Sequence, residues 1–322
     1  MSNTNLLSPL ELKGKKAKNR IVLPPLASRG ATQEGEVTED VIKQYTDRPE
    51  VGIVITEHSY VSAEGRVSEN QLGINDDKLI PGLEKLVKVI KENDSLAGIQ
   101  ITHGGSAARS KVIDRKALAP SAVSHPGRDI DETPEAFTLD QLEELKESFV
   151  KAALRAQKAG FDFIELHGAH GYLLNQFLSP LTNQREDRYG GSFAARLQFP
   201  LEVVRAVREA VGQDYLIFYR LGCDDFLEGG LTVEDSKKAA VQLEEAGVDV
   251  LDLSGGLRGY GPAEEKSDKD EGHFVYLGES IKPEVDIPII ITGGITTPEF
   301  ANQIVREDKT DLVGVGRAML KD

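Results

Sequence analysis

Residues 159–166 read AGFDFIEL and residues 246–253 read AGVDVLDL, so one pattern occurs twice in the chain. In each copy, a helix-like stretch ends at a glycine, and a short run of apolar and acidic residues follows. The same order of helix end, glycine and strand at two places is expected of repeated αβ units. This pair of segments therefore favours a fold in which strands and helices alternate.

Six further segments resemble the strands of this repeat, because they are short, rich in β-branched residues and almost continuously apolar. Such a composition is typical of strands buried on both faces. The eight expected strands span residues 20–27, 52–61, 97–103, 161–167, 216–222, 248–255, 287–294 and 311–317. Eight strands alternating with helices predict an α/β fold of the (β/α)8 TIM-barrel type, with residues 1–322 as a single domain.

The alternative to a barrel is a doubly wound sheet. That fold predicts a G-x-G-x-x-G turn after its first strand, where a dinucleotide would bind. Here Ser28-Arg29-Gly30 follows the first expected strand, and the motif occurs nowhere in the chain. The sequence therefore favours the barrel.

Helix signals occupy two of the stretches between the strands. Thr138 and Gln141 have the spacing of a capping box, and Gly160 stands where a helix ends. Thr232 and Gly247 enclose a second helix in the same way. In the first helix, the apolar residues expected on one face are Leu139, Leu142, Leu145, Phe149, Ala152 and Ala156.

Residues 1–19 precede the first strand and are expected to form a β-hairpin that closes the N-terminal end of the barrel. Its apolar residues are Leu6, Leu7, Leu10 and Leu12. The first residues lack the apolar core of a signal peptide, which predicts a cytoplasmic protein.

Composition excludes several classes of protein. The single cysteine excludes an internal disulfide, a zinc site built from several cysteines and an iron–sulfur cluster on four thiolates. The 38 basic against 53 acidic residues, a net charge of −15, argue against a nucleic-acid partner, which requires clustered positive charge. No apolar run approaches the ~18 residues of a membrane span, so no membrane partner is expected. A homo-oligomer is left open.

Two segments are longer than connecting loops usually are, namely residues 104–137 after the third strand and 256–272 after the sixth. Both follow the C-terminal ends of strands, where barrels carry their active sites. The first contains Arg109, Lys111, Arg115 and Lys116, with Asp114 as the one acidic residue among them. These basic residues predict either a lid that meets an anionic group or a solvated loop.

Histidines are concentrated at one end of the expected barrel. Of six in the chain, His58, His103, His167 and His170 lie at or just beyond the C-terminal ends of strands. Two imidazoles at 167 and 170, with Tyr172 close by, supply hydrogen-bond donors that can bind a carbonyl or phenolate oxygen.

Two other interpretations of these histidines remain. His167 and His170 could be structural residues whose hydrogen bonds are satisfied within the core. His103, His167, His170 and Glu165 could also form a zinc site of a metal-dependent barrel hydrolase. Such hydrolases usually carry His-x-His on the first strand, which is absent here.

Glycine ends the last two expected strands, at Gly293-Gly294 and at Gly314 and Gly316, and Arg317 follows. In barrels, these two loops often hold a phosphate on backbone N–H groups. Arg220, at the end of the fifth strand, places a permanent positive charge at the same end. Because burying an unpaired arginine is costly, its partner is expected to be an anionic ligand or, alternatively, Asp224 or Asp225.

One long motif carries a resemblance to a known family. Residues 167–183 read HGAHGYLLNQFLSPLTN, and Arg185, Asp187 and the YGGS of residues 189–192 follow. Further matches in family order are KNRIV at residues 18–22, GIQITH at 98–103, Arg220, Gly293-Gly294 and Gly316-Arg317. Over residues 6–321 the chain resembles the old yellow enzyme family.

The resemblance implies a barrel that binds FMN without a covalent bond. Reduced NAD(P)H would pass a hydride to FMN, which would pass it to the β-carbon of an α,β-unsaturated carbonyl compound. His167 and His170 would bind the carbonyl oxygen of this small-molecule substrate, and Tyr172 would donate a proton to its α-carbon. The residues implied to bind the cofactor are Pro25, Leu26, Ala27, His58, Gln100, Arg220, Gly293, Gly294, Gly316 and Arg317, and Arg29 is implied at the substrate end.

The chain departs from the family pattern at a few positions. Ala27 replaces a Thr or Cys that can form a hydrogen bond with the flavin. Ser28 and Arg29 make the substrate end more polar, and Ser106 stands where one branch often has arginine. These changes predict an altered flavin potential. They leave open a flavin barrel that mainly reduces quinones or oxygen.

Overall fold

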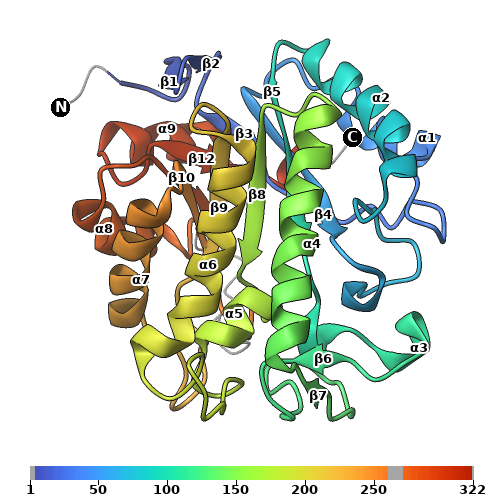
Figure 1. Ribbon diagram of the computed structural model, residues 1–322. Coiled ribbons are helices and arrows are strands. Elements are labelled where there is room, and N and C mark those ends of the chain that lie inside the picture. Colours follow the sequence, from blue (N-terminus) through green and yellow to red (C-terminus); the bar gives the residue numbers. More distant parts are fainter. Residues whose placement is uncertain (1–3, 260–270, 321–322) are drawn as a thin grey trace.

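We describe a computed structural model of the chain, in which residues 4–259 and 271–320 are placed. Eight strands form a closed barrel in which every neighbouring pair is parallel (Figure 1). In chain order they are β3 (Ile21–Leu23), β4 (Ile53–Tyr60), β5 (Leu96–Thr102), β8 (Phe163–Gly168), β9 (Leu216–Gly222), β10 (Val250–Ser254), β11 (Ile289–Thr292) and β12 (Leu312–Gly314). The expected TIM barrel is confirmed, and each of the eight expected segments contains one of these strands.

Helices between the strands cover the outside of the barrel (Figure 1). The longer ones are α1 (Glu39–Tyr45), α2 (Ile80–Lys91), α4 (Leu139–Lys158), α6 (Phe193–Val211), α7 (Val233–Ala246), α8 (Val275–Ile281) and α9 (Pro298–Arg306). Both expected N-terminal caps are present, because Thr138 and Thr232 each form a capping box at the start of α4 and α7. Among the described residues, no helix combines the length and apolarity that crossing a membrane requires.

Several strands are shorter than the apolar segments that predict them. The segment at residues 20–27 forms a strand only as far as Leu23, because Pro24 and Pro25 have no N–H group to donate to a neighbouring strand. Leu139 was expected on the buried face of α4 but is 43% exposed, since it is the first residue of the helix and lies before the first turn that packs on the barrel.

The N-terminal hairpin is confirmed as β1 (Leu10–Leu12) and β2 (Lys15–Ala17), which pair antiparallel. Leu12 and Ala17 are buried against the apolar residues inside the barrel, where the rings of Phe163 and Phe218 stack with centroids 4.0 Å apart. Leu7 was expected among the apolar contacts but is 70% exposed, because it precedes the paired strands. The hairpin therefore closes the N-terminal end through its own strands.

An aspartate lies just before each of β8, β10 and β12, at the N-terminal end of the barrel. Asp162 accepts a hydrogen bond from the N–H of Ala97 at 2.9 Å, and Asp249 accepts one from Ile217 at 2.8 Å. Asp311 does the same with Ile289 at 3.0 Å. Two of these aspartates come from the repeated AGxD motif, so the repeat joins neighbouring strands at this end.

Candidate active site

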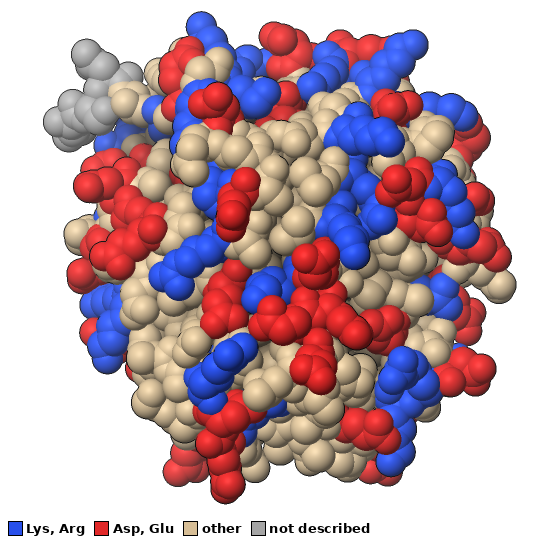
Figure 2. All heavy atoms as spheres, viewed as in Figure 1, with Lys and Arg blue, Asp and Glu red and all other residues tan. Residues whose placement is uncertain are grey.

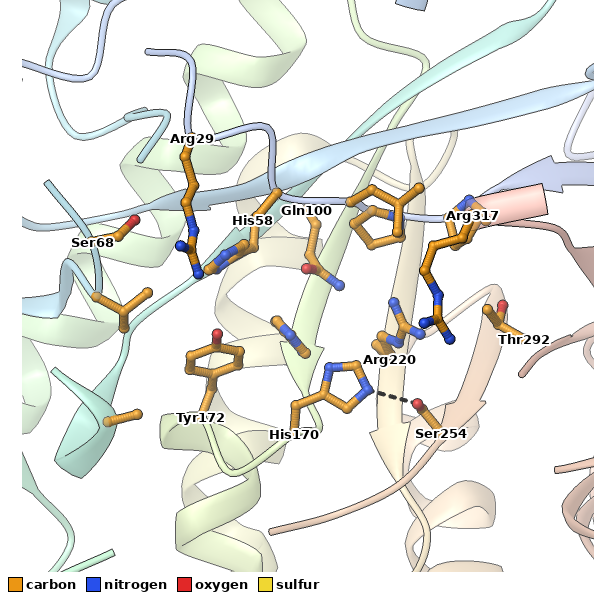
Figure 3. A pocket seen from close by; sticks show the side chains of 18 of the residues that line it. Arg29, His58, Ser68, Gln100, His170, Tyr172, Arg220, Ser254, Thr292 and Arg317 are labelled. Atoms are coloured by element: carbon orange, nitrogen blue, oxygen red, sulfur yellow. Dashed lines mark hydrogen bonds between the residues drawn. The ribbon is translucent and has the colours of Figure 1, made fainter. Parts of the chain in front are cut away.

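A cavity of about 910 Å³ opens at the C-terminal end of the barrel. Its walls come from the ends of barrel strands and from the long loop after β5. Figure 3 shows side chains from several strands converging on this space. All residues that the sequence indicates for catalysis, substrate or cofactor line it, namely Pro25, Leu26, Ala27, Arg29, His58, Gln100, His167, His170, Tyr172, Arg220, Gly293, Gly294, Gly316 and Arg317.

His167, His170 and Tyr172 form one compact group on the cavity wall. After β8 ends at Gly168, the backbone turns through left-handed conformations at His170 (φ 57°) and Gly171 (φ 68°). This tight turn brings the ring of His170 to 5.1 Å and the ring of Tyr172 to 4.7 Å from that of His167, between centroids. Three hydrogen-bonding side chains therefore meet at one point.

Both imidazoles of this group are neutral at neutral pH. Burial lowers the pKa of His167 and of His170 well below the ordinary value, and the positive charges of Arg220 and Arg128 lower both further. His170 Nε2 is hydrogen-bonded to Ser254 Oγ at 2.7 Å, whereas His167 Nδ1 is buried without a partner in the described structure. Both rings line the cavity.

His58, on β4, lies beside the same group. Its ring centroid is 5.3 Å from that of Tyr172 and 6.3 Å from that of His167. Burial lowers its pKa to about 4, with smaller contributions from Arg128, Arg29 and Arg220, so this ring is neutral as well. From the sequence, His58 is expected among the cofactor residues. In the structure its ring lies next to those of His167 and Tyr172.

A polar layer lies across the barrel interior beneath the cavity. Gln100 donates from Nε2 to Glu165 Oε1 at 2.7 Å, and Arg220 Nε lies 3.3 Å from Asp252 Oδ2. Burial raises the pKa of both carboxyl groups, and the charge of Asp252 raises that of Glu165 further. In the described structure Glu165 Oε2 has no hydrogen-bond partner, and Asp252 is held by its ion pair with Arg220. Glu165 and Asp252 are the acidic residues of the repeated motif.

The alternative pairing of Arg220, with Asp224 or Asp225, is wrong, because its carboxylate partner is Asp252. Arg220 and Asp252 are register partners on β9 and β10, so both side chains point into the barrel. Asp224 and Asp225 follow the end of β9, and Asp225 accepts a hydrogen bond from Ser179 Oγ at 2.6 Å in the surrounding loops. Pairing between strands, rather than distance along the chain, decides the partner.

Glycines form the opposite wall of the cavity, after β11 and β12. Gly293 (φ 151°) and Gly294 (φ 65°) adopt backbone conformations that other residues avoid. A Cβ atom on Gly314 would lie 1.9 Å from Thr292 Oγ1, so this position has no room for a side chain. The exposed Arg317 stands beside this bare backbone. The wall has the chemistry that a phosphate group needs.

The loop after β5 is only partly a solvated connector. It contains α3 (Ser110–Ile113) and a small parallel sheet of β6 (Leu118–Ala119) and β7 (Glu135–Ala136). Arg109 and Lys111 line the cavity, whereas Arg115 and Lys116 are exposed away from it, and Ser106 is buried outside it. In the second long segment, residues 260–270 lie outside the described part of the chain.

Sequence reasoning missed Arg128 and Ser254. Arg128 Nη2 donates to the carbonyl of His170 at 2.7 Å, and its guanidinium carbon lies 4.7 Å from the centre of the Tyr172 ring. No motif marks Arg128, because it lies in the long loop 42 residues before His170. Ser254 was recognisable only as the last residue of a strand.

The geometry gives no support to a zinc site. His103 is not among the residues that line the cavity, and its ring packs on Phe137 with centroids 5.7 Å apart. In residues 4–259 and 271–320, no three His, Cys, Asp or Glu side chains lie close enough to hold a metal ion.

Comparison with known proteins agrees with this cavity. The model of the NADH:flavin oxidoreductase / NADH oxidase family matches residues 5–322. The chain belongs to this family. Its membership confirms the resemblance to old yellow enzymes and indicates FMN as the cofactor and NADH or NADPH as the electron donor.

Individual family members are similar to nearly the whole chain. An NADH oxidase of Thermoanaerobacter brockii is 42% identical over 99% of this chain, which spans 49% of that protein. An NADPH dehydrogenase of Bacillus cytotoxicus is 40% identical over 99% of this chain and 90% of its own length. The structure of an old yellow enzyme homologue from Zymomonas mobilis superposes with a TM-score of 0.85, at 26% identity over 97% of this chain and 88% of that one. The chain thus spans about half the length of one relative and most of the other.

Proposed function

We propose that this chain is an FMN-dependent ene-reductase. NADH or NADPH is the electron donor, and the acceptor is a small α,β-unsaturated carbonyl compound or a quinone. The observation that carries the proposal is one cavity with two neutral imidazoles and a phenol on one wall and bare glycine backbone on the other. We further propose that residues 1–322 work as a single domain in the cytoplasm.

The residues present fit FMN. Gly293, Gly294, Gly316 and Arg317 would hold the phosphate, and residues 25–27 would lie behind the ring system. Gln100 and Arg220 would meet the pyrimidine edge, and in the described structure Arg220 Nε has an ionic contact with Asp252 at 3.3 Å but no hydrogen bond. When bound, FMN supplies hydride transfer, from the reduced nicotinamide to an electron-poor C=C bond.

His167 and His170 bind the carbonyl oxygen of the acceptor in this proposal. A neutral imidazole can donate one N–H hydrogen bond, and the low pKa values keep both rings neutral at neutral pH. Negative charge develops on the carbonyl oxygen as hydride arrives at the β-carbon. Donors already fixed in a water-poor site stabilise that charge at little reorganisation cost.

Tyr172 donates the proton that completes the reduction at the α-carbon. Its phenol lies within the histidine group, and the guanidinium of Arg128 lies 4.7 Å from its ring centre. A nearby positive charge stabilises the phenolate that remains after proton donation. This arrangement suits a general acid next to the bound carbonyl.

The cofactor is tested on the purified protein. We expect a yellow protein that releases FMN on acid treatment, becomes colourless with NADH or NADPH without oxygen, and regains its colour with 2-cyclohexenone. A preparation that cannot be loaded with FMN would overturn the proposal. The choice between NADH and NADPH is read from the same reduction rates.

The roles of the side chains are tested by splitting the reaction into two steps. Tyr172→Phe should slow reoxidation by 2-cyclohexenone about a hundredfold and leave reduction by NADPH nearly unchanged, since general acids contribute about that much. The control is Tyr276→Phe, an exposed tyrosine that does not line the cavity. Equal slowing of both steps would contradict proton donation by Tyr172.

The histidine pair is tested by ligand binding. His167→Ala combined with His170→Ala should raise the dissociation constant of 4-hydroxybenzaldehyde at least about tenfold, because two hydrogen bonds to its oxygen are lost. FMN content should stay the same, since neither ring belongs to the glycine wall. An unchanged dissociation constant for the phenol would contradict oxygen binding by His167 and His170.

A further inference from the structure

The cavity is strongly cationic, although the chain carries a net charge of −15. Glu69 is the one carboxylate among its described lining residues, against six cationic side chains: Arg29, Arg109, Lys111, Arg128, Arg220 and Arg317. In Figure 3, Arg220 and Arg317 lie on one side of the cavity and Arg29 lies on the other, beyond His58. The first two serve the flavin in the proposed function. The positive charge of Arg29, on the other side of the cavity, has no part in the proposed hydride transfer.

Arg29 is aimed into the cavity by a buried carboxylate that binds its backbone. Glu57 accepts hydrogen bonds from Ser28 N at 3.2 Å, from Ser28 Oγ at 2.5 Å and from the backbone N–H of Arg29. This turn holds Arg29 at φ 54°, a left-handed conformation that non-glycine residues adopt uncommonly. Glu57 thus fixes the backbone and leaves the guanidinium group unpaired.

Arg128 approaches the same space from the long loop. One of its five N–H donors is used on the carbonyl of His170, and its planar group lies over the Tyr172 ring. In the described part of the chain, neither Arg29 nor Arg128 has a carboxylate within 4.0 Å. Both charges act on His58, whose pKa they lower in addition to the larger effect of burial. The two guanidinium groups therefore line one cavity in which Glu69 is the one described carboxylate, and neither is paired with it.

We propose that Arg29 and Arg128 form a binding site for a carboxylate on the electron acceptor, so that the natural substrate class is an unsaturated carbonyl compound bearing a nearby acid group. This rests on the proposed function. A guanidinium group binds carboxylates through paired, charge-assisted hydrogen bonds. Because Arg128 contacts the Tyr172 ring itself, the anion it binds lies beside the reacting carbonyl.

The electron donor fits this position less well. In a nicotinamide dinucleotide, a ribose separates the nicotinamide ring from the nearest phosphate, so its negative charge lies farther from the reacting atoms. Arg109 and Lys111, at the exposed edge of the cavity, are better placed for such a distant phosphate. The acid group at Arg29 and Arg128 is therefore assigned to the acceptor.

The test compares two acceptors that differ only in charge. 3-Oxocyclohex-1-ene-1-carboxylate and its carboxamide have nearly the same shape, and the ratio of their kcat/KM values measures preference for the acid. We expect the FMN-loaded enzyme to prefer the carboxylate at least about tenfold, and Arg29→Gln to reduce the ratio about tenfold. The control is Arg115→Gln, an exposed arginine of the loop after β5 that does not line the cavity. Equal ratios in all three proteins would overturn the proposal.

Arg128 is tested with two variants, because its contact with His170 also supports the loop. Arg128→Gln should lower the preference as Arg29→Gln does, and Arg128→Lys should restore part of it by returning the charge. Loss of preference in both variants, with no difference between them, would point to loop distortion and contradict a direct ionic contact.

A binding measurement separates this inference from the proposed reaction. Calorimetry with 4-hydroxybenzoate and 4-hydroxybenzamide should show tighter binding of the acid, weakened about tenfold by Arg29→Gln and by added salt. This result would support the carboxylate site even if no enone is reduced. If the enzyme reduces neutral 2-cyclohexenone but shows no preference for acids, the carboxylate site is wrong and the proposed reaction still holds. If Arg29→Gln slows only flavin reduction by NADPH, the charge serves the donor and the proposal is wrong.

Discussion

At the N-terminal end of the barrel, the carboxylates of Asp162 and Asp249 are paired with cations and with backbone N–H groups. Farther along the same strands, in the described structure, Glu165 has one buried oxygen without a hydrogen-bond partner, and Asp252 has Arg220 as its one ion-pair partner. Each pair comes from the two copies of one sequence motif, with the acidic residues three positions apart. One motif thus supplies carboxylates with several partners at the N-terminal end and carboxyl groups with few partners inside the barrel.

The difference separates stability from function within a single structural unit. Buried charges that are fully paired hold neighbouring strands together, and removing one partner is costly. Buried polar atoms without partners cost free energy and persist where a ligand uses them. Barrel enzymes in general bind their ligands at the C-terminal ends of the strands.

The largest effect is expected at the N-terminal end. Asp249→Ala should lower the free energy of unfolding by about 3–5 kcal/mol, because it leaves the buried Arg208 without its partner. Urea denaturation measures this loss, with Asp214→Ala, an exposed aspartate, as control. Equal stability of the two variants would mean that the paired aspartates do not support the barrel.

The N-terminal hairpin should contribute nearly as much to the free energy of unfolding as Asp249 does. Leu12→Ala should cost about 2–5 kcal/mol, because Leu12 is 4% exposed and packs on the apolar interior. Leu7→Ala, at a position 70% exposed, should change stability by less than about 0.5 kcal/mol. Similar losses in both variants would contradict closure of the barrel by the paired strands.

A substitution at Glu165, inside the barrel, should raise the free energy of unfolding rather than lower it. Burial raises the pKa of Glu165, so the folded state binds this proton more tightly, and the stability it contributes is lost as pH rises above the ordinary value of 4.5. Glu165→Gln removes that loss and still accepts from Gln100. It should be about 1 kcal/mol more stable than the unchanged protein at about pH 8, with a smaller gain at about pH 5.

The control for this prediction is Glu147→Gln, which replaces an exposed carboxylate on α4. Its stability should follow that of the unchanged protein at both pH values. If Glu165→Gln destabilises the protein across this pH range, the unpaired oxygen of Glu165 is not a cost, and the contrast between the two ends fails.

The smallest effect concerns the flavin. Ala27→Thr should raise the midpoint potential of bound FMN by about 20 mV, the equivalent of one ordinary hydrogen bond to the reduced form. Ala194→Thr, on the outer face of α6, is the control. An unchanged potential would mean that position 27 does not contact the ring system.

Local patterns predicted the elements well, and spatial pairing explains what they missed. The apolar segment 216–222 matches β9 residue for residue, and the capping box at Thr138 starts α4 as expected. By contrast, Asp252 faces Arg220 only because two strands pair in that register. Arg128 reaches Tyr172 from a loop whose path no periodicity encodes.

The surface shows the same limit of sequence reasoning. The net charge of −15 means that acidic residues outnumber basic ones in the chain. Figure 2 shows Lys and Arg interspersed with Asp and Glu across the face covered by α4 and α6. Total charge does not say how charges are distributed, because each side chain's position depends on the packing of its helix.

The apolar cluster that Leu12 and Ala17 complete has a consequence for proton traffic. It fills the barrel interior on the hairpin side of Glu165 and Asp252. Hydrocarbon side chains offer no donor or acceptor for a proton to pass along, so in the described structure this cluster insulates the two carboxyl groups from solvent on the hairpin side.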